Sequence, residues 1–264
     1  MKKLISAAAS IAAAATPLPA LAGPTKPTIV LVHGAFETAE VWGYVVAKLE
    51  KDGYKVKNIA LPGRPGNERA VTEISLDLYQ RTVASAIADE TGPVVLVGHS
   101  FGGFTISAEA EAEPQKIKTL VYVAAYIPRN GDSLLSLATA DSGSKLGPVL
   151  DIDKEHGLAS VKPGAGGGVF ASDGPQQVQD AVSGAVVAEP LAPLATPVTL
   201  TADRFGKVDK VAIRTLRDQV ISTGYQATMI KATPVRLSLT IDTGHVPFLT
   251  QPDALAAEIE KAAG

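Results

Sequence analysis

The sequence predicts an α/β fold in which a mostly parallel sheet is covered by helices on both faces. Apolar runs of strand length alternate along the chain with longer segments whose apolar residues have helical spacing, and this alternation is typical of βα units. The runs are close to uniformly apolar, as expected of strands that are buried on both faces. The expected strands are residues 28–32, 55–60, 94–97, 119–124, 211–215 and 235–241.

Helices are expected between these strands and at the end of the chain. Residues 41–51 follow the first strand with helical spacing, and residues 74–89 place apolar side chains along one side of a helix. Residues 104–111 are compatible with a helix directly after the third strand. Pro252 precedes a last helix over 253–262, and proline suits the first turn of a helix because the N–H that it lacks would be unpaired there.

The alternation breaks between residues 127 and 197, a stretch rich in Gly, Pro, Ser and Ala. It is too long for an ordinary connection, so we expect a flexible cap, made of short helical pieces, over the carboxyl edge of the sheet. Its glycine run at 164–168 is not a phosphate-binding loop, because no Gly-Lys-Ser/Thr follows it.

The first 22 residues have the pattern of an export signal. Met1-Lys2-Lys3 is followed by an apolar, alanine-rich stretch and by Ala20-Leu21-Ala22, which resembles a cleavage site. The stretch is short for a membrane span, although an uncleaved anchor is the alternative. We therefore expect a single domain over 23–264 and a periplasmic or secreted protein.

Composition excludes several kinds of site. The chain has no cysteine, which rules out disulfides, thiolate metal sites and a cysteine nucleophile. A formal net charge of −3, with no basic stripe, argues against nucleic acid and anionic membranes as partners. No spacing such as H-E-x-x-H is present, so we expect neither a metal nor a cofactor. The oligomeric state stays open.

Gly98-His99-Ser100-Phe101-Gly102 has the pattern G-x-S-x-G and lies between the third expected strand and the helix after it. In that context the pattern is a nucleophile elbow, a tight turn that holds the serine hydroxyl above the carboxyl edge of the sheet. The alternative is a chance Gly/Ser turn. We expect Ser100 to be a nucleophile.

A serine needs a base to take its proton and a third group to orient that base. Of the four histidines, His33 is expected to shape a loop, His99 to be a packing residue and His156 to lie in the cap. His245 follows the last strand, on a loop at the carboxyl edge. We expect His245 to be the general base.

The orienting carboxylate should lie between the serine and the histidine in the chain. Asp203 and Asp209 precede the penultimate strand and would therefore lie toward the wrong edge of the sheet. Asp218 follows that strand by three residues, so it is the expected acid. Asp242, three residues before His245, is the alternative.

Negative charge that develops on a carbonyl oxygen needs backbone donors. The amides of Ala35, after the first strand, and of Phe101, after the serine, are expected to form this oxyanion hole. Phe36, Val246 and Phe248, with Phe101 and apolar cap residues, are expected to line a pocket for a small or medium apolar ester.

Taken together, these motifs resemble a known family. The similarity runs through 30–35 with Trp42, 53–56, 61–63, 98–103, 201–208, Asp218, Gly244-His245 and Gln251-Pro252. On these residues the chain resembles the α/β-hydrolases of the plant methylesterase and hydroxynitrile lyase type, with their bacterial esterase relatives. The elbow is common to many hydrolases, whereas residues 205–208 are more particular to this group. The middle of the cap has no clear counterpart.

The resemblance implies an α/β-hydrolase fold with a cap inserted after the strand that follows the elbow. It also implies a serine carboxylic-ester hydrolase that forms an acyl-enzyme, with Ser100, His245 and Asp218 as triad and Ala35 and Phe101 as oxyanion hole. Hydroxynitrile lyases of this group have a lysine after the catalytic histidine, where this chain has Val246. A carbon–carbon lyase and a non-catalytic ligand-binding protein are the alternatives.

Overall fold

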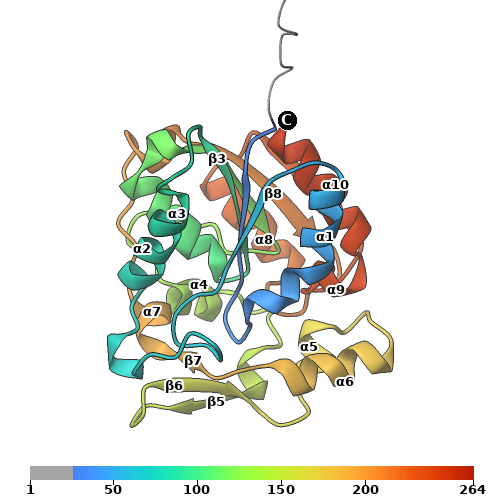
Figure 1. Ribbon diagram of the computed structural model, residues 1–264. Helices are drawn as coiled ribbons and strands as arrows, with labels where there is room; N and C mark the ends of the chain where they lie inside the picture. The colour runs from blue at the N-terminus through green and yellow to red at the C-terminus, as the bar shows by residue number, and fades with distance from the viewer. Residues whose placement is uncertain (1–25) are drawn as a thin grey trace, which may run out of the picture.

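A six-stranded, wholly parallel sheet forms the centre of the protein (Figure 1). The computed structural model describes residues 26–264, so the expected export signal at 1–22 lies outside the described residues. The strand order is β2-β1-β3-β4-β8-β9. The strands are β1 Ile29–Val32, β2 Val56–Ile59, β3 Val94–His99, β4 Ile117–Val123, β8 Asp209–Thr215 and β9 Leu237–Ile241.

Burial differs between the inner and the edge strands of this sheet. Every residue of β1 and β3 is buried, because helices cover both faces at the centre. Exposed residues alternate with half-buried ones along most of β9, an edge strand. The predicted α/β class and mostly parallel sheet are confirmed.

Helices cover both faces of the sheet. Right-handed crossovers between parallel strands place α1 on one face of the sheet and α2, α3 and α8 on the other, while α10, after the last strand, packs against α1 (Figure 1). Ser75 begins α2 by accepting a hydrogen bond from the Leu78 amide at 3.1 Å, as is typical of an N-cap. None of the described helices is long and apolar enough to span a membrane. The helices are α1 Gly43–Lys51, α2 Leu76–Ile87, α3 Gly102–Ala112, α8 Thr223–Ala232, α9 Pro247–Thr250 and α10 Pro252–Ala263.

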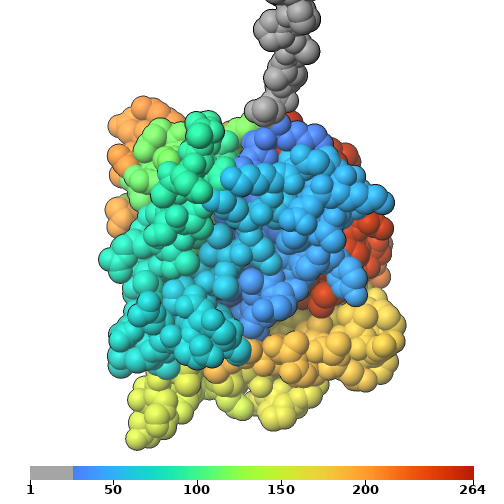
Figure 2. Space-filling model, viewed as in Figure 1, coloured from blue at the N-terminus to red at the C-terminus, as the bar shows by residue number. Residues whose placement is uncertain are grey.

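The cap lies between β4 and β8 and covers the carboxyl edge of the sheet, at the bottom of Figure 1. Figure 2 shows it packed against the body as a continuous layer. Besides short helices it contains a three-stranded antiparallel sheet, so the expectation of helical pieces alone was wrong. Its strands have two to four residues, too few for periodicity to identify them. The cap elements are α4 Leu134–Ala140, β5 Leu150–Asp153, β6 Leu158–Val161, α5 Gly166–Phe170, α6 Gln176–Ala185, β7 Glu189–Pro190 and α7 Leu191–Ala195.

Candidate active site

Ser100 lies in a strained turn between β3 and α3. Its φ is +50°, a conformation that residues with a Cβ adopt at a cost and that is often found at functional sites. Close packing enforces the turn: a Cβ on Gly98 would lie 2.7 Å from the carbonyl carbon of Gly102, and one on Gly103 would lie 2.1 Å from the Tyr126 carbonyl oxygen. The expected elbow therefore has the geometry that its sequence pattern predicts.

The structure brings His245 and Asp218 together. His245 Nδ1 lies 2.9 Å from Asp218 Oδ2, and both side chains are buried. The carboxylate also accepts hydrogen bonds from the Thr215 hydroxyl at 2.9 Å and from the Val220 and Ile221 amides at 2.8 and 3.0 Å. These donors fix the orientation of the carboxylate toward the imidazole.

The second nitrogen of His245 is available for proton transfer. His245 Nε2 is buried and has no hydrogen-bond partner among residues 26–264. Ser100 borders the cavity at the carboxyl edge, and the hydrogen bond between a nucleophile and its base often forms only in the substrate complex. The arrangement leaves one nitrogen oriented by Asp218 and the other unengaged.

The other candidate acids contact cations elsewhere. Asp242 is largely exposed and lies 3.0 Å from Arg217 Nε. Asp203 pairs with Lys207, and Asp209, at the start of β8, pairs with Arg236. Each therefore has the surroundings of a charge near the surface.

The loop after β1 is fixed by buried carboxylates on either side of Ala35. The Gly34 amide donates to Glu37 Oε2 at 2.7 Å, and the Phe36 amide donates to Glu189 Oε2 at 3.0 Å. The Ala35 amide between them has no hydrogen-bond acceptor in the described part of the chain. It is thus free to donate to a substrate oxygen.

His33 fixes the orientation of the Ala35 amide. His33 Nε2 accepts from the Leu61 amide at 3.2 Å, so its proton resides on Nδ1, which donates to the Gly34 carbonyl oxygen at 2.9 Å. In a trans peptide the carbonyl oxygen and the following N–H point in opposite directions. Burial, together with the charge of Arg64, lowers the pKa of His33 to about 4, so the ring is neutral at neutral pH.

His99 is not merely a packing residue, which corrects the expectation from the sequence. Its Nδ1 lies 2.9 Å from Glu37 Oε2 and its Nε2 lies 2.8 Å from the carbonyl oxygen of His245. The same Glu37 oxygen accepts from the Gly34 amide. One buried pair therefore contacts the loops that carry Ala35 and His245.

A second buried pair fastens the cap to the body. Glu189 of β7 pairs with Arg64 Nη2 at 2.5 Å, and both side chains are buried. The Tyr79 hydroxyl lies 3.4 Å from Glu189 Oε1, and Arg64 Nε donates to the Glu37 carbonyl oxygen at 3.0 Å. Because Glu189 also accepts from the Phe36 amide, this contact links the cap to the loop of Ala35.

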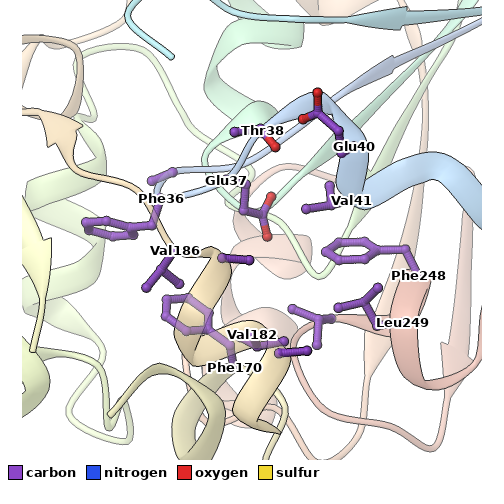
Figure 3. Close-up of a pocket in the computed structure, with 14 residues that line it drawn as sticks. Phe36, Glu37, Thr38, Glu40, Val41, Phe170, Val182, Val186, Phe248 and Leu249 are labelled. Atoms are coloured by element: carbon purple, nitrogen blue, oxygen red, sulfur yellow. The ribbon is translucent and has the colours of Figure 1, made fainter. Parts of the chain in front are cut away.

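Two cavities adjoin this site. The first, of about 440 Å³, contains Ser100. Except for Lys154, the rest of its lining is apolar or aromatic: Ala35, Phe36, Tyr126, Leu134, Leu135, Ala138, Leu146, Leu150, Ile152, Ala159, Phe170, Leu191, Leu194, Ala195 and Val220. The second, of about 250 Å³, lies between the loop after β1, α6 and α9 (Figure 3).

Not all of the expected pocket residues line the serine cavity. Phe36 borders both cavities, whereas Val246 and Phe248 border only the second one. The Phe101 ring borders neither; it is buried, with its centroid 6.2 Å from that of Tyr79. The expectation that Phe101 lines the pocket was therefore wrong, because its side chain points into the core.

The arrangement supports acyl-transfer chemistry. A serine on a strained elbow and the residue with the free backbone amide border the same apolar cavity. An imidazole oriented by a carboxylate packs against the ring of His99, the residue before that serine. Within residues 26–264, no cluster of three or more His, Cys, Asp or Glu side chains could hold a metal ion.

The fold and motifs are those of a known family. Residues 29–258 match the alpha/beta hydrolase family, and the chain belongs to it. The resemblance seen in the sequence is thereby confirmed.

Three similar proteins are informative. A chloroplastic protein of Arabidopsis thaliana, named as methylesterase 11, is 30% identical over 247 residues, which cover 86% of this chain but only 61% of that protein. The pyrethroid hydrolase of Sphingobium wenxiniae is 27% identical, with 89% of this chain and 87% of that protein covered. The crystal structure of a pyrethroid hydrolase from Sphingobium faniae aligns with a TM-score of 0.80 at 25% identity, over 90% of this chain and 97% of that chain. These relatives support a carboxylesterase-type hydrolase.

Proposed function

We propose that the protein is a serine carboxylic-ester hydrolase that works through an acyl-enzyme intermediate. The observation that carries this proposal is the contact between His245 and Asp218 at 2.9 Å. The centroid of the His245 ring lies 4.7 Å from that of His99, which directly precedes a serine held at φ +50°. Relatives named as methylesterase and pyrethroid hydrolase agree with this class of reaction.

In the first half of the reaction Ser100 Oγ attacks the ester carbonyl carbon, while His245 Nε2 takes the hydroxyl proton. The amides of Ala35 and Phe101 donate to the carbonyl oxygen as it becomes negative. Asp218 keeps the proton of the neutral ring on Nδ1 and stabilises the imidazolium that forms. The tetrahedral intermediate then collapses: the bond from the carbonyl carbon to the alkoxy oxygen breaks, His245 protonates that oxygen, and the alcohol leaves while the acyl group stays on Ser100 Oγ.

In the second half, water attacks the acyl-enzyme and His245 takes its proton. The tetrahedral intermediate collapses, His245 returns the proton to Ser100 Oγ, and the carboxylic acid leaves. Every proton is thus carried by one imidazole, and no step needs a metal or a cofactor.

The substrate that we propose is a small to medium apolar ester. The lining of the serine cavity is apolar or aromatic apart from Ser100 and Lys154, and its volume is about 440 Å³. Such a cavity favours an apolar acyl group through the hydrophobic effect and offers little to compensate for desolvating a highly charged one.

A panel of p-nitrophenyl esters of rising acyl length tests this proposal, with mandelonitrile assayed beside it. We expect a burst of p-nitrophenol and an optimum at short to medium acyl chains. Ser100→Ala should retain only the small residual rate that the binding site and the oxyanion hole supply without a nucleophile. Cleavage of mandelonitrile without ester hydrolysis would favour the lyase. Ligand binding without any turnover would favour a non-catalytic protein.

We also propose export, on the basis of the amino-terminal sequence alone. Cleavage after Ala22 would give a mature chain that begins at Gly23. Amino-terminal sequencing of the protein from a periplasmic or culture fraction tests this, and a mature chain that begins at Met1 would contradict it.

A further inference from the structure

We propose that Glu37 and His99 are positioning residues. They form a buried ion pair that fixes the loop of Ala35, the nucleophile and the general base relative to one another. The inference rests on the proposed function. Glu37 binds the amide of Gly34, next to Ala35, and His99 directly precedes Ser100. The Nε2 atom of His99 lies 2.8 Å from the backbone oxygen of His245. One pair of side chains therefore contacts all three catalytic segments.

The hydrogen-bond partners of His99 determine its charge. A backbone carbonyl oxygen can only accept, so the proton facing the His245 carbonyl belongs to His99 Nε2. Glu37 Oε2 already accepts from the Gly34 amide at 2.7 Å, and as a carboxylate it accepts from Nδ1 as well. Both ring nitrogens then carry protons, which makes His99 an imidazolium and Glu37 its counterion.

Burial and charge act in opposite directions on this pair. Burial alone would lower the pKa of His99, but the Glu37 carboxylate and the His245 carbonyl raise it above its usual value. Burial would likewise raise the pKa of Glu37, yet the charge and hydrogen bond of His99 and the Gly34 amide lower it. The attraction thus keeps both groups charged where either alone would become neutral.

The packing around the pair leaves little room for movement. A Cβ on Gly34 would lie 2.9 Å from Ser100 Cβ, 3.0 Å from Glu37 Oε2 and 3.1 Å from His99 Nδ1. The His99 ring also lies against the ring of His245, at 4.7 Å between centroids, and edge-on to Phe248 at 4.8 Å. A displaced Glu37 would release the Gly34 amide, in the peptide directly before the one that carries the oxyanion donor, and misplacing a catalytic group by about 1 Å can lower the rate about 100-fold.

Kinetics of Glu37→Gln, His99→Phe and the double variant test this role. The amide that Glu37→Gln introduces can still accept from the Gly34 amide and can donate to a neutral His99 ring, but it carries no charge to hold the imidazolium. We therefore expect kcat to fall about 10- to 100-fold, with KM within about threefold of the parent. The double variant should lose no more than about threefold beyond the worse single variant, because the residues act as a unit.

Tyr122→Phe is the matched control for loss of a buried hydrogen bond, since the Tyr122 hydroxyl contacts the Ser107 hydroxyl at 2.8 Å in the core. It should leave kcat nearly unchanged. If His99→Phe does not fold because Glu37 is left unpaired, the kinetics of Glu37→Gln and of the double variant decide whether the pair has a positioning role. The positioning role would be overturned if the folded Glu37 and His99 variants kept a kcat within about threefold of the parent. It would also be overturned if their loss of kcat equalled that of Tyr122→Phe.

Nitrogen NMR of the full chain with ¹⁵N-labelled histidine provides a readout that does not depend on activity. Only four histidines contribute, and His99→Phe identifies the signal of His99. We expect two protonated nitrogens at neutral pH in the parent and a neutral ring in Glu37→Gln. A neutral His99 in the parent would refute the ion pair, even if ester hydrolysis at Ser100 were established. Failure of ester hydrolysis would instead refute the proposed function, while two protonated nitrogens in this spectrum would still support the ion pair.

Discussion

Replacing Glu189 with glutamine should destabilise the folded protein by about 3–5 kcal/mol, the range expected when one partner of a buried ion pair is removed. Arg64 and Glu189 are both buried and pair at 2.5 Å. A glutamine would still offer an acceptor to the Phe36 amide, but the Arg64 guanidinium would remain charged and buried without a counterion. The size of the destabilisation comes from this unpaired buried charge rather than from the lost contact itself.

Urea unfolding measures this effect. The single tryptophan, Trp42, is buried in the core, so its fluorescence reports global unfolding. With a slope of about 3 kcal/mol per molar urea, the midpoint should fall by about 1–2 M. Asp77→Asn, which breaks the exposed pair between Asp77 and Arg81, should leave the midpoint nearly unchanged. A midpoint for Glu189→Gln within about 0.3 M of the parent would refute the role of this pair in fastening the cap.

Three further predictions concern the site, the core and the cap. Asp218→Asn should lose at least about 100-fold in kcat with an unchanged circular dichroism spectrum, whereas Asp242→Asn should stay within about threefold; the reverse result would move the acid to Asp242. Burial raises the pKa of Glu109 from 4.5 to about 7, so the folded state binds the proton more tightly and stability falls as pH rises through this range. The stability advantage of Glu109→Gln over the parent, from urea midpoints, should therefore grow by about 2 kcal/mol between about pH 5 and 8, and an advantage independent of pH would contradict this. Leu194→Trp, which narrows the serine cavity, should shift the optimum of ester hydrolysis to shorter acyl chains while fluorophosphonate labelling of Ser100 is retained. An unchanged dependence on chain length would show that the cap surface at Leu194 does not contact the substrate.

The sheet and the meeting of the candidate catalytic segments at one of its edges follow from local patterns. Uniformly apolar runs predict buried parallel strands, and the carboxyl ends of parallel strands lie at the same edge. Ser100, Asp218 and His245 each follow such a run, so the sequence alone predicts that they lie close together. The position of Asp218 after β8, as opposed to Asp209 at its start, depends on the same reasoning.

The features that the sequence did not reveal depend on contacts between distant segments. The Phe36 amide and Glu189 are separated by 153 positions, and the contact between Glu37 and His99 joins residues 62 positions apart. No spacing rule connects such residues. The directions of side chains were equally hidden: Phe101 was expected in the pocket because of its place in the chain, yet its ring packs against Tyr79 in the core.

Labelling with a fluorophosphonate probe tests the proposed serine mechanism most directly, because the probe reacts covalently only with an activated nucleophile. We predict one label per chain, placed on Ser100 by mass spectrometry and absent from Ser100→Ala. A label on another residue, or undiminished labelling of Ser100→Ala, would contradict the mechanism.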